Sequence, residues 1–169
     1  MKKSFIFFSV MVFICGSVLF SPSYSFSQSG ELNFKISYKI TDVQSSGVEG
    51  IKGNELGTAN GKGTADFEDG NTAGMTSFFI FDYTDGSGDF TAYYALSFGD
   101  GSGTILMKAV GTTVHTDTKS VFNADVTFLR GSGKYAGITG SGKMTGEREA
   151  DVAPDAQDVL EIKASYEIK

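Results

Sequence analysis

The residues best placed for phosphate chemistry lie in a glycine-rich stretch, GSGKYAGITGSGKMTGE, at positions 131–147. Gly137 to Met144 follows the phosphate-binding pattern G-x-x-x-x-G-K-[ST] up to its last position. Met144 stands where that pattern needs a hydroxyl for magnesium, and Gly146 opposes the helix that such a loop must open. We therefore interpret the stretch as packed β-structure with tight corners. The corner glycines are Gly131, Gly133, Gly137, Gly140 and Gly142.

The other groups capable of chemistry are sparse. His115 is the single histidine and lies in the polar stretch TTVHTDTK, which is typical of a solvated loop. A serine–histidine–acid triad would need this histidine, and no serine lies in a nucleophile-elbow context. A zinc site needs several His or Cys ligands, and a chain with a single histidine and a single cysteine does not supply them. Asp82, Asp85, Asp89 and Asp100 flank glycine turns without EF-hand spacing, so hairpin turns explain them. We expect no metal and no cofactor, and no catalytic residue can be assigned.

The beginning of the chain has the pattern of a secretory signal. Lys2 and Lys3 precede an apolar run from Phe5 to Phe20, and serines at 23, 25 and 27 supply a small-x-small cleavage pattern. The run of about 16 residues is shorter than the ~20 that a membrane-spanning helix needs, although an uncleaved anchor is the alternative. We expect a cleaved signal peptide at 1–27, one domain at 28–169, and a secreted or periplasmic location. The only cysteine, Cys15, lies in the signal, so the domain has no disulfide.

The charge balance argues against a polyanionic partner. The chain has 14 basic and 20 acidic residues. Without Lys2 and Lys3 the domain would carry a charge of about −8, and Arg130 and Arg148 are its only arginines. Nucleic-acid binding needs clustered cations. We therefore expect no nucleic-acid partner and no membrane attachment after signal cleavage.

The remaining sequence alternates between apolar and polar residues. The stretches ELNFKISYKITD (31–42) and VLEIKASYEIK (159–169) have period two, which predicts half-buried strands. Asp-Gly-Ser-Gly turns at 85–88 and 100–103 predict hairpins between further strands. We count about eight antiparallel strands and find no helical period after the signal. Pairing the first strand with the last removes both open edges. The predicted fold is an all-β, eight-stranded antiparallel up-and-down barrel.

One strand, MTSFFIFDY at 75–83, carries apolar residues on both faces. Phe78 and Ile80 lie on one side. We assign the other side to a subunit interface, with a covering loop as the alternative. The interface candidates are Met75, Phe79, Phe81 and Tyr83.

The interior of the predicted barrel should be rich in aromatic rings. Either a flat ligand fills the space between these rings or the rings interdigitate. Barrels of eight strands lie near the boundary between filled and hollow. The candidates for lining a ligand cavity are Phe34, Tyr38, Phe90, Tyr94, Phe98, Phe122, Phe128 and Tyr166.

The run FLRGSGKYAGITGSGKMTG (128–146) resembles a motif of the allene oxide cyclase barrel-like superfamily, which includes the plant dirigent proteins; the match covers Gly131 to Met144. The resemblance implies an eight-stranded antiparallel barrel with an apolar cavity, often trimeric. It also implies that some relatives cyclise or steer reactive small molecules. The cysteine of the plant cyclases has no counterpart in 28–169.

Three functions follow as hypotheses. The first is a barrel that binds a small hydrophobic or aromatic molecule in its interior. The second is a cofactor-free cyclase or isomerase that uses the same cavity. The third is a structural barrel whose interior is filled. If the interior has no room for a ligand, the loops at 43–58 and 111–120 are the remaining candidate surfaces.

Overall fold

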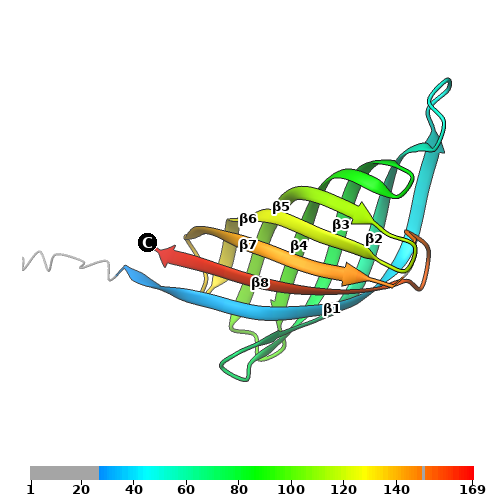
Figure 1. Ribbon diagram of the computed structural model, residues 1–169. Helices are drawn as coiled ribbons and strands as arrows, with labels where there is room; N and C mark the ends of the chain where they lie inside the picture. Colours follow the sequence, from blue (N-terminus) through cyan, green and yellow to red (C-terminus); the bar gives the residue numbers. More distant parts are fainter. Residues whose placement is uncertain (1–26, 150) are drawn as a thin grey trace, which may run out of the picture.

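The computed structural model describes residues 27–149 and 151–169, so the expected signal peptide lies almost entirely outside the described residues. Each strand pairs antiparallel with its sequence neighbours, and the last strand pairs with the first to close the barrel (Figure 1). The predicted all-β, eight-stranded up-and-down barrel is therefore confirmed. The strands are β1 (Gln28–Gly47), β2 (Asn54–Phe67), β3 (Thr72–Thr84), β4 (Ser87–Phe98), β5 (Gly103–His115), β6 (Ser120–Gly133), β7 (Ile138–Arg148) and β8 (Gln157–Ile168).

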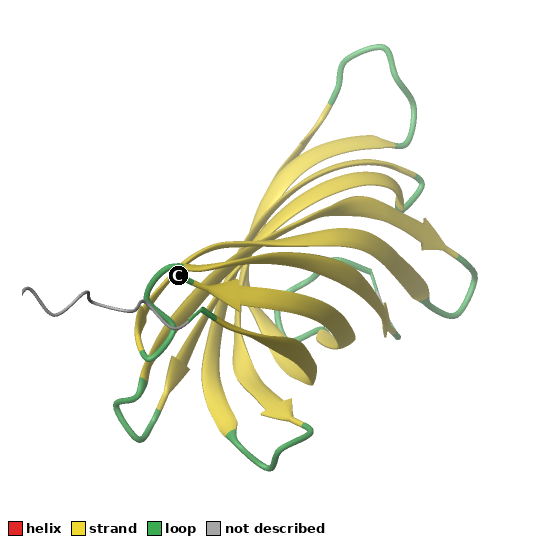
Figure 2. Cartoon of the chain, turned by 90° about the vertical axis from the view of Figure 1, so that its left-hand side faces the viewer, coloured by secondary structure: helices red, strands yellow, loops and turns green. Residues whose placement is uncertain are grey.

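All connections gather at the two ends of the barrel (Figure 2). The β1–β2 hairpin, cyan in Figure 1, projects past one end. In the β3–β4 turn, Asp85 and Gly86 adopt φ angles of 49° and 77°. Two consecutive positive φ angles are those of a type I′ turn, whose twist matches that of the strands it joins. Among the described residues, no helix is long and apolar enough to cross a membrane.

The inner face of β2 is built from small residues between Gly57 and Ala65, and this lets rings from the neighbouring strands lie across it. A Cβ atom added at Gly57 would collide with the Phe81 ring, and one at Gly61 would lie 2.5 Å from the Tyr38 ring. Large rings on β1 and β3 thus fill the space that β2 leaves. This arrangement packs the barrel interior tightly.

The five corner glycines all lie where a backbone carbonyl approaches closely. Gly137 and Gly140 have φ angles of 80° and 145°, and a Cβ atom at Gly137 would lie 2.6 Å from the Lys169 carbonyl oxygen. A Cβ atom at any of the other four would also collide with a carbonyl oxygen of a nearby residue. These residues are Tyr135 for Gly131, Ser102 for Gly133, Ser165 for Gly140 and Lys163 for Gly142.

The corner holds Tyr135 against one end of the barrel, which we call the closed end. Tyr135 is 8% exposed and stacks on Phe98 with ring centroids 4.8 Å apart. Phe98 contacts Phe67 at 5.3 Å, and Phe67 stacks on Phe34 at 4.7 Å. The Lys134 ammonium lies 5.3 Å from the Phe98 ring centroid. Four aromatic rings therefore plug this end.

The interface assignment on β3 is wrong about which side faces outward. Met75, Phe79, Phe81 and Tyr83 are at most 5% exposed and point into the barrel, whereas the outward Phe78 and Ile80 are 42% and 48% exposed. Alternation gives the period of a strand but not its phase when both faces are apolar. Pairing fixes the phase, since Phe81 lies opposite Phe90, another inward ring.

A candidate site at the open end

A row of polar side chains crosses the inner wall at the end opposite the aromatic plug. Five residues on five neighbouring strands are directly opposed in register: His115 on β5, Ser120 on β6, Arg148 on β7, Asp158 on β8 and Tyr38 on β1. Directly opposed residues of antiparallel strands have Cβ atoms about 4.5–5.5 Å apart. The five side chains therefore form one continuous belt, which we call the polar row.

The polar row runs from solvent into the interior. His115 Nε2 lies 3.4 Å from Oδ1 of Asp151, which is 80% exposed in the β7–β8 connection. His115 Nδ1 lies 2.9 Å from Ser120 Oγ. Further along, Arg148 Nη1 lies 3.4 Å from Asp158 Oδ1, with both side chains at most 2% exposed. The Arg148 guanidinium also lies 5.1 Å from the Phe122 ring centroid.

Burial controls the electrostatics of the inner half of the row. Burial raises the pKa of the Asp158 carboxyl, and the nearby Arg148 charge only partly opposes this rise. Burial also raises the pKa of Tyr38, helped by Tyr94 and Asp158. The pKa of Tyr94 is raised for the same main reason. Both phenols thus stay protonated and can donate hydrogen bonds.

Tyr83 adds a further hydroxyl near the row. Its Oη lies 2.7 Å from Thr113 Oγ1, and both residues are buried. Burial raises the pKa of Tyr83 as well. The ring of Tyr83 stacks on Phe81 at 4.8 Å. This part of the inner wall therefore consists of aromatic rings and one hydroxyl group, that of Tyr83, which its contact with Thr113 holds in place.

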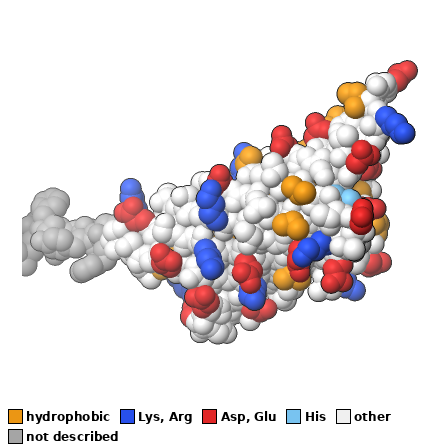
Figure 3. Space-filling view, in the orientation of Figure 1, with side chains coloured by type: hydrophobic (Ala, Val, Ile, Leu, Met, Phe, Trp, Pro, Cys, Tyr) orange, Lys and Arg blue, Asp and Glu red, His pale blue; other side chains and the backbone are white. Residues whose placement is uncertain are grey.

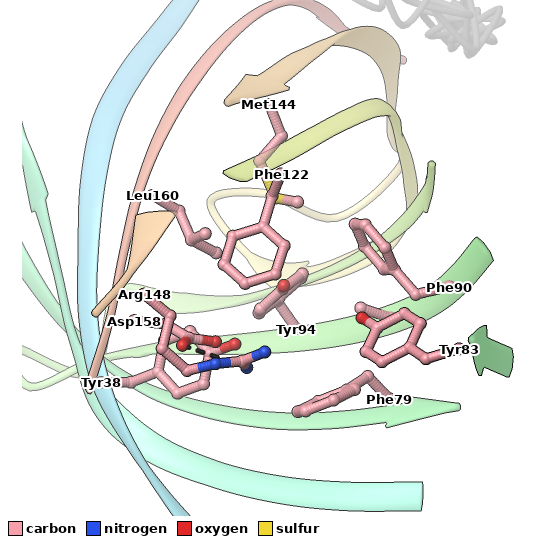
Figure 4. A pocket seen from close by; sticks show the side chains of 11 residues that line it. Tyr38, Phe79, Tyr83, Phe90, Tyr94, Phe122, Met144, Arg148, Asp158 and Leu160 are labelled. Carbon is pink, nitrogen blue, oxygen red and sulfur yellow. Dashed lines mark hydrogen bonds and ion pairs between the residues drawn. The ribbon is translucent and has the colours of Figure 1, made fainter. Parts of the chain in front are cut away.

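The interior beneath the row is almost filled. Its cavity has a volume of about 10 Å³, which is room for about one water molecule. The lining side chains converge on it from all sides (Figure 4). Phe90 and Phe122 meet edge to face at 6.0 Å. Of the two alternatives left open by the sequence, a gap for a flat ligand and interdigitating rings, the structure has the second here, with the rings packed over small residues on β2.

A larger cleft lies above the row, between the turns of the open end. This mouth cleft has a volume of about 380 Å³, within the range of small-molecule sites. Tyr83 and Arg148 line both the cleft and the interior cavity. Three acidic residues on the rim surround one arginine, and acidic side chains gather at this end, on the right in Figure 3. The cleft is lined by Gly53, Glu55, Tyr83, Asp85, Gly86, His115, Ser120, Arg148, Asp151 and Val152.

The predicted cavity residues are divided between the two ends. Tyr38, Phe90, Tyr94 and Phe122 line the interior cavity. Phe34 and Phe98 belong to the closed end, and Phe128 is buried elsewhere in the core. Tyr166 is only partly buried, and its hydroxyl accepts a hydrogen bond from Gln28 at 3.3 Å.

His115 is not the solvated loop residue that its polar neighbours indicate. It is the last residue of β5, is 26% exposed through its side chain, and has contacts at both ring nitrogens. Sequence reasoning missed Ser120, Arg148 and Asp158 as site residues. Their positions continue the inward alternation of Phe122, Met144 and Leu160, and this phase is the signal that could have found them.

Comparisons with known proteins add little to this geometry. No protein family and no curated protein matches the chain. Among solved structures, pyocyanin demethylase is similar over 77% of this chain and 98% of its own, at 14% identity with a TM-score of 0.42. A similarity at that level carries no argument about activity. The described residues hold no group of three or more potential metal ligands. Membership of the allene oxide cyclase barrel-like superfamily stays a prediction, and the findings establish a small all-β barrel.

Proposed function

We propose that this barrel binds a small molecule in the mouth cleft, with a flat apolar part against Tyr83 and a polar group at the row. The observation that carries the proposal is the buried Arg148–Asp158 pair, whose arginine lines a ligand-sized cleft. A buried ion pair is weak support for stability, because apolar side chains of similar volume stabilise as well or better. Buried ionisable groups in a cleft are instead typical of functional sites.

The cleft is favoured over the interior as the binding position. A cavity of about 10 Å³ admits no ligand unless several rings move. The cleft lies partly on the surfaces named from the sequence as those left over if the interior is filled, since four of its ten lining residues fall within 43–58 and 111–120. The other six come from the ends of β3 and β7 and from the turns that follow these strands. A secreted or periplasmic location and a homo-oligomeric, trimeric state remain parts of the proposal that rest on the sequence. The cyclase or isomerase alternative gains no support from this interior.

Binding can be tested with a neutral, flat fluorescent probe such as Nile red. We expect saturable binding near one probe per chain. Val152→Trp should fill the cleft and weaken binding at least ~10-fold, equivalent to about 1.4 kcal/mol. Val159→Trp is the matched control, because Val159 is 40% exposed and lies outside the cleft. If the folded wild-type protein does not bind the probe, or if both variants bind it equally, the remaining hypothesis is a structural barrel with a filled interior.

A further inference from the structure

We propose that Ser120 is a nucleophile and His115 its general base, so that the mouth cleft hydrolyses small esters. The inference rests on the proposed function, because the ester must enter the same cleft. The two residues are directly opposed on β5 and β6, with Ser120 Oγ 2.9 Å from His115 Nδ1. This separation lies within the reach required of a nucleophile and its base.

Asp151 sets the form of the imidazole. Its carboxylate lies 3.4 Å from His115 Nε2. A carboxylate at Nε2 favours the tautomer that carries the proton there, which leaves Nδ1 free to accept the Ser120 proton. Asp151 is thus a positioning residue that also stabilises the imidazolium formed during reaction.

Arg148 lies on the other side of the nucleophile. It is directly opposed to Ser120 across the β6–β7 pair, and both side chains are buried in the wall of the cleft. A guanidinium beside the attacked carbonyl stabilises the negative charge that develops on its oxygen. Ser120 is therefore flanked by a base on one strand and a cation on the next, which is the minimum arrangement for acyl transfer.

The reaction balances with water as the only co-substrate. Ser120 Oγ bonds to the ester carbonyl carbon while its proton passes to His115 Nδ1, and the carbonyl π electrons move to the oxygen beside Arg148. The tetrahedral intermediate expels the alcohol, which takes the proton from His115 and leaves an acyl-serine. Water then adds with His115 as base, and collapse releases the carboxylic acid and returns the proton to Ser120.

The volume, lining and charge of the mouth cleft predict which esters it accepts. Its volume of about 380 Å³ and its aromatic wall at Tyr83 fit a short acyl chain on an aryl leaving group. Glu55, Asp85 and Asp151 on the rim repel anionic substrates. We therefore expect neutral aryl acetates to react and esters that carry a carboxylate to react more slowly.

The test uses a fluorophosphonate probe and p-nitrophenyl acetate with the folded domain. We expect one label per chain at Ser120, located by peptide mass spectrometry. Ester hydrolysis should fall at least ~10²-fold in Ser120→Ala and in His115→Asn, since general base catalysis contributes 10²–10⁴-fold. Ser141→Ala, an exposed serine on β7, is the control and should react like the wild type. Asp151→Asn should lower kcat for p-nitrophenyl acetate and leave KM near the wild-type value, because the residue orients the base and does not bind the ester.

The outcomes separate this inference from the binding proposal. Ser120→Ala should unfold cooperatively with the same midpoint as the wild type, which shows that its lost hydrolysis is chemical and not a loss of folding. Wild-type protein that binds Nile red but takes no label, or Ser120→Ala that hydrolyses the ester like the wild type, overturns the nucleophile and leaves the binding site intact. Wild-type protein that neither binds nor reacts overturns both.

Discussion

Removing one partner of the Arg148–Asp158 pair should destabilise the barrel far more than removing both. The joined atoms lie 3.4 Å apart in side chains that are at most 2% exposed. At an effective dielectric constant of about 20, two charges at that distance attract by about 5 kcal/mol. The cost of desolvating two ions is of similar size, so the intact pair contributes little net stability. A single substitution leaves one ion uncompensated and should cost about 3–5 kcal/mol.

Urea unfolding at pH 7 measures this difference. The variants are Arg148→Met, Asp158→Leu and the double substitution Arg148→Met with Asp158→Leu. We expect both single variants to lose about 3–5 kcal/mol of unfolding free energy and the double variant to lose less than ~1.5 kcal/mol. The exposed pair of Lys35 and Glu161, 3.0 Å apart, is the control, and Lys35→Met should cost less than ~1 kcal/mol.

Two results would refute this reasoning. Single variants within ~1 kcal/mol of the wild type would mean that water or neighbouring groups compensate the remaining charge. A double variant as unstable as the sum of the single variants would mean that the two residues do not act as a pair. The double variant also serves the binding proposal, because it should fold while losing the polar group that anchors the ligand.

Three further predictions concern the pH dependence, the corner and β3. Burial raises the folded pKa of Asp158 above its ordinary 3.8, so this group stabilises the fold fully below that value and the contribution is lost as pH rises through the folded pKa. Unfolding measured from pH 4 to 7 should therefore show the wild type losing stability relative to Asp158→Asn as pH rises. Gly137→Val should cost more than ~1 kcal/mol, because φ is 80° there, whereas Gly99→Val, with open space around its Cβ, should melt like the wild type. Phe79→Asp should abolish cooperative unfolding because it buries a charge, whereas the outward Phe78→Asp should fold, and light scattering on it reports whether that face holds subunits together.

The fold was predictable because its determinants are local. Alternation in 31–42 and 159–169 is visible in any window of ten residues, and the Asp-Gly turns need no long-range information. The phase of β3 was not predictable in this way. Phe78 and Phe79 are both apolar, and only the pairing with β4 decides which one points inward.

Alternation can indicate that each residue of the polar row faces inward, but the assembly of these residues into one row depends on long-range register and could not be read from spacing. His115 and Ser120 are five residues apart, but Tyr38 and Asp158 meet only because β1 pairs with β8. At the end of a strand too few alternating residues remain to show the period of two. The sequence around His115 therefore indicates a loop although the residue ends β5. Inward polar residues at strand ends are where a barrel can place functional groups with least loss of core packing.

The two ends of this barrel differ in their lining, because aromatic rings close one end and polar side chains line the other. The glycine motif that resembles the allene oxide cyclase barrels, Gly131 to Met144, forms the corner that holds Tyr135 in the aromatic plug. The polar row and the mouth cleft lie at the opposite end, on residues outside the motif. Arg148 shares β7 with the last residues of the motif but is not part of it. The glycines of this motif are needed because other backbone segments approach them closely. The motif therefore specifies how this end of the barrel is closed. In this chain the motif lies away from the mouth cleft, so an activity of this barrel must be argued from the open end.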